Sequence, residues 1–377
     1  MLECGLIGER SYIPHDDGGE DGPVTSSPGA GADPCTASRL LLFSLRGTSG
    51  RSSAECSFNK DKYLASLLSH PSPQERSHPD TILIYTNNLS SHFLFFITTE
   101  RNDQEQKVRI KVLRETCGRG NYSFEDINQE HLRHLIVDDK HGIIYCFLPK
   151  VACTNWKRVM YVLAQGEPYS DPSSISGKLV HFTNKIVGLN TFPRPEIKAK
   201  LKHYTKFLFV RHPFIRLISA YRDKFQKNNE FYYHNFARDI LRLYGNQPHP
   251  PHSVNDAFAA GIRMSFNNFI QYLLDPRTER RAPFEPHWRQ MHRLCHPCHI
   301  PYDFVGHQET LQEDADHLLK LVGLDDDIKF PPTYEKETSD GFMEDFFKDV
   351  PLEDRRKLYK LYREDFRLFG YTDKIQS

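Results

Sequence analysis

The sequence of 377 residues has no net charge, because 49 Lys and Arg balance 49 Asp and Glu. A neutral chain is not expected to bind nucleic acid or membranes through bulk charge. No secretory signal opens the sequence. The aromatic content of 12% excludes a chain that is disordered throughout. These absences leave one large globular domain or two smaller ones.

The charges are unevenly placed along the chain. Residues 149–227 hold 15 Lys and Arg against 4 Asp and Glu, and residues 308–354 hold 4 against 15. A concentrated cationic stretch is suited to hold something anionic, whereas an acidic stretch is more often a solvated face. Both stretches are also compatible with ordinary helix surfaces.

The N-terminal region is poor in regular patterns. Gly, Ser and Pro interrupt every candidate period in the first 75 residues. Residues 81–99 carry no charge over a length that could span a bilayer, but polar residues such as Asn87 and Asn88 lie at the centre. A strand pair or a buried hairpin is the alternative to a membrane anchor. We therefore expect residues 1–122 to be poorly structured and residues 123–377 to form the folded domain.

Two strand–turn–helix units are predicted in the folded domain. Residues 142–148 form a short apolar run before a helix over 155–164, and residues 207–210 form another before a helix over 214–225. Such units are typical of an α/β fold with a parallel sheet. Capping and periodic patterns predict further helices at 123–135, 266–274, 314–322 and 352–369.

The turn of the first unit contains candidate anion-binding residues. The strand runs through Pro149, Lys150, Val151, Ala152, Cys153, Thr154 and Asn155 directly into a helix. A helix N-terminus directs backbone N–H groups and a positive dipole at one point. The segment lacks the glycines of the Walker pattern, which argues against a nucleoside triphosphatase. From the residues alone, a phosphate cradle and a plain strand–helix turn remain equally open.

The second unit offers a complementary pair. Arg211 stands where the strand ends, and Ser219 lies about two turns into the following helix. An arginine at the carboxyl end of a parallel strand can make a bidentate contact with a phosphate, which a nearby hydroxyl can complete.

Together the two units resemble a known family. Residues 148–158, LPKVACTNWKR, resemble the 5′-phosphosulfate loop of the Golgi carbohydrate sulfotransferases, and residues 209–221, FVRHPFIRLISAY, resemble their 3′-phosphate motif. Further similarity covers residues 131–371 and is greatest to the chondroitin 4-O-sulfotransferases. The resemblance implies a P-loop-like sulfotransferase fold, an α/β domain with a central parallel sheet flanked by helices.

The resemblance also implies a reaction and the roles of several residues. The donor would be 3′-phosphoadenosine 5′-phosphosulfate, held by residues 149–155 on its 5′ side and by Arg211 and Ser219 at its 3′-phosphate. In-line transfer needs positioning and charge on the leaving oxygen, a role that we assign to Lys150. No metal is required. His181 is the candidate general base because a near-neutral histidine can accept a sugar hydroxyl proton, and His287 is the reserve, which could instead contact the acceptor beside Trp288.

The implied acceptor is an anionic glycosaminoglycan, with transfer to the 4-hydroxyl of N-acetylgalactosamine in chondroitin. Its carboxylates and sulfates could lie along a groove lined by the cationic surplus, or these side chains could form a solvated helix face. The residues concerned are Lys198, Lys200, Lys202, Lys206, Arg222, Lys224 and Lys227, with Arg277, Arg280 and Arg281 as a second patch.

The cysteines admit two readings. Cys295 and Cys298, with histidines between and around them, superficially suggest a zinc site, but a second half is missing. Because the family works in the oxidising Golgi lumen, disulfides are favoured, and their pairing stays open. Cys153 is interpreted as a small residue that allows close backbone approach and not as a nucleophile.

The chain departs from the family pattern in two ways. Family members carry an N-terminal anchor and a stem, whereas this chain begins with a polar stretch and offers only residues 81–99 as an imperfect anchor. A lumenal domain at the Golgi membrane is thus implied by resemblance alone, as is glycosylation at the sequons of Asn88 and Asn121. The second departure is His212, where an acidic residue is expected between Arg211 and Pro213.

Other functions remain as alternatives. The chain could sulfate dermatan or other glycans, or it could be a glycan-binding relative without activity that keeps a degenerate nucleotide site. The presence of Lys150, Arg211 and Ser219 disfavours the latter. A P-loop kinase or nucleotide hydrolase lacks both the glycines and an acidic partner for magnesium.

Overall fold

A computed structural model describes residues 100–332 and 342–372. The predictions for the first 75 residues, for residues 81–99 and for the sequon at Asn88 lie outside the described residues. In the part of the chain that is described, none of the helices is both long enough and apolar enough to cross a membrane.

The core of the fold is a five-stranded sheet in the order β3-β1-β2-β4-β5. Its strands are β1 (Leu135–Asp138), β2 (Ile143–Cys146), β3 (Val187–Gly188), β4 (Thr205–Val210) and β5 (Phe304–His307). β2, β4 and β5 pair in parallel, while β1 pairs antiparallel with both β2 and β3. The α/β class is confirmed, but the sheet is mixed and not wholly parallel.

The antiparallel strand β1 replaces the end of a predicted helix. Ser123 and Asp126 do form a capping box, but it begins only the short 3-10 helix η1 (Phe124–Asp126), which is followed by η2 (Gln129–His134). The next four residues are all buried as β1, which hydrogen-bonds to β2. The helix predicted over residues 123–135 was wrong because the capping signal is local, whereas pairing with β2 decides the conformation that follows.

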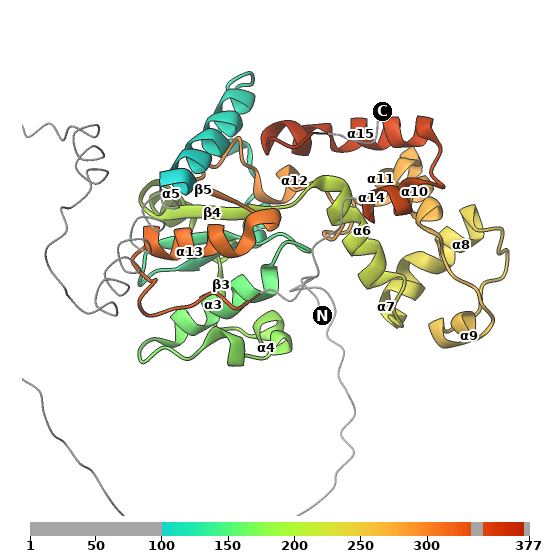
Figure 1. Ribbon diagram of the computed structural model, residues 1–377, viewed down its shortest axis with the longest axis horizontal. Coiled ribbons are helices and arrows are strands. Elements are labelled where there is room, and N and C mark those ends of the chain that lie inside the picture. The colour runs from blue at the N-terminus through green and yellow to red at the C-terminus, as the bar shows by residue number, and fades with distance from the viewer. Residues whose placement is uncertain (1–99, 333–341, 373–377) are drawn as a thin grey trace, which may run out of the picture. The chain divides into compact units, whose positions relative to one another are not determined.

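Helices and turns surround the sheet (Figure 1). α3 follows β2 and contacts β1 and α4, α13 follows β5 and packs on it, and α12 contacts η2. The bounds are α3 (Cys153–Gln165), η3 (Pro172–Ser174), α4 (Gly177–Phe182), η4 (Leu189–Thr191), α5 (Arg194–His203), α12 (His292–Cys295), η6 (Gln308–Thr310) and α13 (Leu311–Leu321). The apolar faces of α3, α5, α12 and α13 share one hydrophobic core with the sheet.

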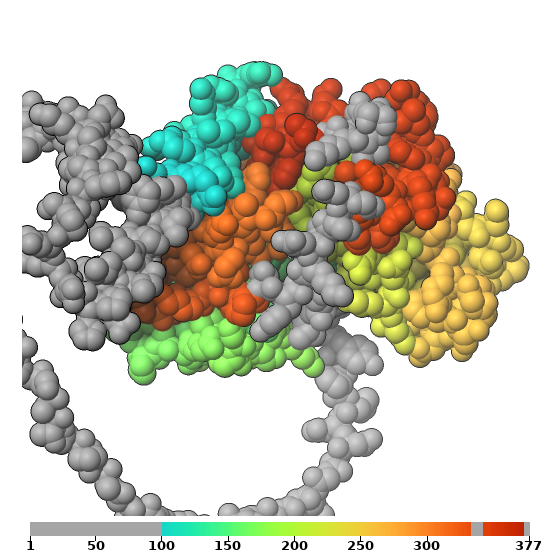
Figure 2. Space-filling view, viewed as in Figure 1, coloured from blue at the N-terminus to red at the C-terminus, as the bar shows by residue number. Residues whose placement is uncertain are grey.

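A second hydrophobic core lies among helices beside the sheet. Its elements are α6 (Pro213–Lys224), α7 (Glu230–Tyr232), the π-helical turn η5 (Tyr233–Ala237), α8 (Arg238–Tyr244), α9 (Val254–Ala259), α10 (Phe266–Leu274), α14 (Phe342–Phe347) and α15 (Leu352–Leu368). The short helix α11 (Pro276–Arg281) contacts α10. The predicted helix over 266–274 is confirmed as α10. In Figure 2 the segment from α7 to α9 (yellow) lies at the right-hand side of the view.

Residues 100–117 belong to the N-terminal region that the sequence predicts to be poorly structured. In the structure they form a helix (cyan in Figure 1) that packs against the edge strand β5. Gln106 hydrogen-bonds to both the backbone oxygen and nitrogen of Val305 in β5. Arg109 forms an ion pair of 2.8 Å with the buried Asp314 of α13. Cys117 is joined to Cys298 by a disulfide. Three kinds of contact thus attach this helix to the domain.

Candidate functional site

The turn between β2 and α3 has the geometry of an anion cradle. Lys150 and Ala152 both adopt the left-handed region, with φ of 70° and 46°. Alternation of such residues in a turn directs successive N–H groups to one side. Ala152 is the N-cap of α3, and its methyl side chain leaves the first-turn N–H groups without a side-chain acceptor. The residues of this turn therefore fit a phosphate or sulfate group at the helix N-terminus.

Lys150 lies in a buried cluster of charges. Its Nζ is 3.1 Å from Oδ2 of Asp223, and both side chains are at most about a tenth exposed. Asp223 also contacts Lys224 at 3.4 Å and Lys227 at 3.0 Å. Burial alone would raise the pKa of Asp223, but the charges of Lys150 and Lys224 outweigh it and hold this pKa below its usual range. Three lysines around one carboxylate leave a surplus of positive charge beside the turn.

Two arginines connect the second unit to the first. Arg211, buried at the end of β4, donates from Nη1 to the backbone oxygen of Lys150 at 3.2 Å. Arg216, one turn into α6 and 1% exposed, donates to the carbonyl oxygens of Pro149, Arg289 and Pro286 at 2.9, 2.7 and 2.7 Å. The predicted 5′ and 3′ motifs therefore meet in the fold.

The remaining residues predicted to bind the donor differ in their burial and in their contacts. Ser219 is half-buried on α6, and Val151 is fully buried in the core under the turn. Cys153 is the first residue of α3 and is buried. The Asn155 side chain accepts from Nη1 of Arg158 at 2.9 Å and donates to the backbone oxygen of Pro331 at 3.4 Å. Val151 can thus contribute to a donor site only through its backbone.

His181, the candidate base, lies beside the cradle. It comes from α4, and its Nε2 is 3.1 Å from Oγ1 of Thr154. Nζ of Lys157 lies 3.4 Å from its Nδ1 and also over the ring of Phe147. Burial, and then the charges of Lys157 and Lys224, lower the pKa of His181 to about 3, so the imidazole is neutral at pH 7. Burial lowers the pKa of Lys157 to about 8.

His287, the reserve base, forms a dyad with a carboxylate. Its Nδ1 lies 2.7 Å from Oε1 of Glu285, to which Tyr232 also donates at 3.0 Å. Burial lowers the pKa of His287 despite the opposing effect of Glu285, and the charges of Lys224 and Lys150 lower it further. A histidine that donates Nδ1–H to a carboxylate presents the lone pair of Nε2 for proton transfer.

Sequence reasoning missed Lys157, Asp223, Arg216 and Glu285 as parts of the site. Lys157 and Arg216 stand inside the two quoted motifs, so their position was a usable signal. Asp223 enters through contacts between α6 and the cradle, which no local pattern indicates, whereas Glu285 lies two residues before His287, inside a segment that itself resembles the family.

The lysines predicted to line an acceptor groove lie in two different regions of the fold. Lys224 and Lys227 lie at the charge cluster, but Lys200 pairs with Asp139 and Glu196, and Lys206 pairs with Asp303 at 2.7 Å. Lys198 pairs with Glu125. Because Lys206 is at the amino end of β4, these lysines lie away from the edge of the sheet that carries the cradle. Each of these three lysines forms an ion pair with a nearby carboxylate.

The cysteines near the end of the sheet form disulfides. Cys146 in β2 joins Cys295 in α12, and Cys298 joins Cys117. The preference for disulfides over zinc is confirmed for these residues, and the partner of Cys298 was missed because Cys117 precedes the predicted domain. Within residues 100–332 and 342–372, no group of three or more His, Cys, Asp or Glu is arranged to hold a metal ion.

His212 stands where the family pattern has an acidic residue, and in the fold a carboxylate from another segment, Glu309, contacts it. The backbone N–H of His212 donates to Oε1 of Glu309 at 2.9 Å, and Tyr371 donates to the same carboxyl group at 2.8 Å. Glu309 belongs to the acidic stretch. This stretch also supplies Asp314, which is buried and accepts from Arg109, so it is not merely a solvated face.

The family is established by comparison with known proteins. A model of the sulfotransferase family matches residues 133–372, and the chain belongs to this family. It is 52% identical over 288 residues to carbohydrate sulfotransferase 12 of Mus musculus, covering 71% of this chain and 69% of that protein. It is 44% identical over 244 residues to carbohydrate sulfotransferase 11 of Rattus norvegicus, covering 64% and 68%. No solved structure gives a significant match.

These relationships confirm the predicted resemblance to carbohydrate sulfotransferases. The chain is a sulfotransferase enzyme, and the family implies 3′-phosphoadenosine 5′-phosphosulfate as the sulfate donor and a glycan as the acceptor.

Proposed function

We propose that the chain transfers the sulfuryl group of 3′-phosphoadenosine 5′-phosphosulfate to the 4-hydroxyl of N-acetylgalactosamine in chondroitin. The observation that carries the chemistry is the open N-terminus of α3 with Lys150, Lys224 and Arg211 beside it. The choice of chondroitin and of the 4-hydroxyl rests on the sequence resemblance. Sulfation of dermatan or another glycan is the alternative within the same chemistry.

The donor would be held by the cradle and by the end of β4. Backbone N–H groups of residues 149–155 and the ammonium of Lys150 would contact the 5′ side, and Arg211 with Ser219 would contact the 3′-phosphate. Lys150 pairs with Asp223 in the structure, and this pair holds its ammonium beside the cradle. Asp223 is thus proposed as the residue that positions Lys150.

The reaction exchanges one sulfur–oxygen bond for another. The acceptor hydroxyl oxygen bonds to sulfur while the bond to the 5′-phosphate oxygen breaks, and the released electron pair stays on that phosphate. Lys150 would stabilise the negative charge that develops there. The hydroxyl proton passes to a base, so the products are a sulfate ester, 3′-phosphoadenosine 5′-phosphate and a protonated base.

His181 is the proposed base, and it must release a partner to act. A neutral imidazole that accepts from Lys157 at Nδ1 carries its proton on Nε2, directed at Thr154. Breaking the contact with Lys157 frees the lone pair of Nδ1 for the hydroxyl proton. His287 is the second candidate, since its contact with Glu285 leaves Nε2 as the proton acceptor.

Product analysis tests the acceptor and the position of transfer. The full chain is incubated with labelled donor and desulfated chondroitin, and with desulfated dermatan in parallel, and the products are cleaved to disaccharides. We expect label on the 4-hydroxyl of N-acetylgalactosamine from chondroitin. Label on the 6-hydroxyl would overturn the position, and a clear preference for dermatan would overturn the acceptor.

A further inference from the structure

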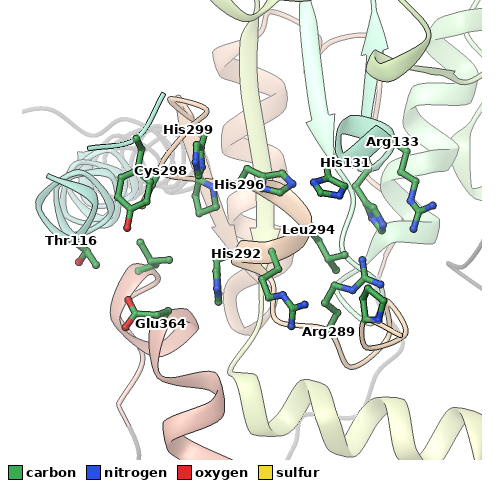
Figure 3. A pocket seen from close by; sticks show the side chains of 16 residues that line it. Thr116, His131, Arg133, Arg289, His292, Leu294, His296, Cys298, His299 and Glu364 are labelled. Carbon is green, nitrogen blue, oxygen red and sulfur yellow. The ribbon is translucent and has the colours of Figure 1, made fainter. Parts of the chain in front are cut away.

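A cavity of about 540 Å³ lies apart from the cradle, on the side where η2, α12 and α15 meet the end of helix 100–117. This volume is in the range of small-molecule sites. Figure 3 shows His131 and Arg133 on one side of the cavity and Thr116 and Glu364 on the other. The disulfides of Cys295 and Cys298 fix the lining segment 292–299 to β2 and to helix 100–117. We call this cavity the α12 pocket.

Three arginines give the α12 pocket a positive charge. Arg133, Arg289 and Arg293 all line it. Burial, and then the positive charges of Arg293 and Arg133, lower the pKa of Arg289, while Glu285 and Glu279 oppose this effect. Nε of Arg289 donates a hydrogen bond to the carbonyl oxygen of Phe284, and Nη1 of Arg293 donates to the side chains of Glu279 and Gln290. Among the described residues, none provides a carboxylate within ion-pair distance of Arg133.

Glu279 pairs with Arg293 at 2.7 Å, so Arg133 and Arg289 supply the excess positive charge of the pocket, and the lining carboxylate Glu364 is engaged elsewhere. Glu364 is paired with Arg367 at 3.1 Å and with Arg363 at 3.5 Å on its own helix. His296 contributes no charge at neutral pH, because burial and the neighbouring histidines lower its pKa to about 4. The half-exposed ring of Tyr122 lies edge-on to His299 and offers an apolar surface on which a sugar ring can pack.

Two contacts connect the α12 pocket to the cradle. His134, a lining residue, hydrogen-bonds to the backbone oxygen of Phe147 and packs on its ring, over which the ammonium of Lys157 also lies. The backbone oxygen of Arg289 accepts a hydrogen bond from Arg216, which also holds Pro149 of the cradle. Contacts through Phe147 and Lys157 thus link His134 of the pocket to His181, the proposed base.

We propose that the α12 pocket binds a carboxylate-bearing sugar of the acceptor glycan while another sugar of the same chain lies at His181. This inference rests on the proposed function, because it assumes an anionic glycan as acceptor. A carboxylate that enters the pocket offsets the positive charges that Arg133 and Arg293 place on Arg289 and forms charge-assisted hydrogen bonds with the guanidinium groups of the lining. The pocket then determines affinity for the acceptor and not the rate of the chemical step.

The test compares wild-type protein with the double variant Arg133→Gln and Arg293→Gln. Both side chains are at least partly exposed, and the ion pair that Arg293 loses is a surface pair of small energy, so the fold is expected to persist. The control is Arg101→Gln, a surface arginine that lies about 22 Å from Thr116 along helix 100–117. A urea unfolding curve of each variant verifies its stability.

Binding of desulfated chondroitin oligosaccharides to the full chain is measured by calorimetry without donor, and also with oligosaccharides whose carboxyl groups have been reduced to alcohols. We expect the double variant to bind the carboxylated form at least tenfold more weakly than wild type, and the control to bind as wild type does. The carboxyl-reduced form should bind wild type and double variant equally.

Steady-state kinetics provide the second readout. For the double variant, the KM for desulfated chondroitin should rise at least tenfold, while kcat and the KM for the donor stay unchanged. Equal binding of the carboxylated form by wild type and variant would overturn the inference, as would an equal loss with the carboxyl-reduced form. If wild type binds with the predicted pattern but transfers no sulfate, the proposed function fails and the pocket assignment stands.

Discussion

At the scale of single residues, the charged groups around the cradle have separate tasks. Lys150 and Arg211 are placed for the donor, and Asp223 holds Lys150 beside the turn. His181 and His287 are both neutral at pH 7 because burial lowers their pKa, so each is in the protonation state that a general base requires. Their surroundings differ, and this difference can be tested.

Replacement of His181 by Ala is expected to lower kcat by about a hundredfold or more while the affinity for 3′-phosphoadenosine 5′-phosphate is kept, because a general base contributes to the chemical step and not to donor binding. Rapid-quench or steady-state kinetics with calorimetry measure both quantities. A near-normal kcat would transfer the role to His287, whose replacement by Gln should then produce the loss.

Replacement of Arg211 by Ala is expected to weaken binding of 3′-phosphoadenosine 5′-phosphate at least tenfold. Loss of a charged hydrogen bond costs roughly 1.5–3 kcal/mol, and the variant also loses the contact that holds the backbone of Lys150. Calorimetry measures the dissociation constant, with the exposed Lys202→Ala as the control. An unchanged dissociation constant would remove Arg211 from the donor site.

At the scale of elements, α6 connects the two halves of the site. Its residue Arg216 donates three hydrogen bonds to carbonyl oxygens of the cradle and of the segment over 286–289. Nearly complete burial of this guanidinium means that water cannot replace it when it is removed. Arg216 therefore stabilises the relative placement of the cradle and the α12 pocket.

Replacement of Arg216 by Met is expected to lower the free energy of unfolding by about 3 kcal/mol or more, because three buried carbonyl groups lose their donors. Urea denaturation measures the change. The matched control is Arg222→Met on the same helix, whose exposed side chain should cost well under about 1 kcal/mol. Equal stability of the two variants would contradict the role given to Arg216.

Some elements of the fold were predictable from the sequence and others were not. The strand–turn–helix units at β2–α3 and β4–α6 were predictable because each combines a short apolar run, a turn and an amphipathic helix within a few residues. β1 was not, because its four buried residues continue a segment with a local capping signal and become a strand only by pairing with β2. Likewise Lys150 was identified from its motif, whereas Asp223 reaches the site through tertiary packing.

At the scale of the whole molecule, the disulfides bear on the compartment in which the chain works. Two disulfides join segments far apart in the sequence, and such bonds persist in oxidising compartments. We propose the lumen of the Golgi apparatus, with membrane attachment, as the location, which rests on the family resemblance and is supported by these disulfides.

Asn121 provides a test of this location. Its side chain is exposed and begins an Asn-Tyr-Ser sequon. In animal cells we expect Asn121→Gln to migrate faster than wild type by one glycan, and glycosidase treatment to abolish the difference. Asn102→Gln, which lies outside any sequon, should migrate as wild type does. Identical migration of all three proteins would contradict glycosylation at Asn121 and remove this support for a lumenal domain.

The central claim is that the turn over residues 149–155 holds the sulfate donor, with Lys150 on the leaving phosphate. Its most direct test is transfer of labelled sulfate from 3′-phosphoadenosine 5′-phosphosulfate to desulfated chondroitin by wild type, Lys150→Ala and the exposed control Lys107→Ala. The account predicts comparable incorporation by wild type and control and a loss of at least a hundredfold with Lys150→Ala. Incorporation by Lys150→Ala at the wild-type rate would contradict it.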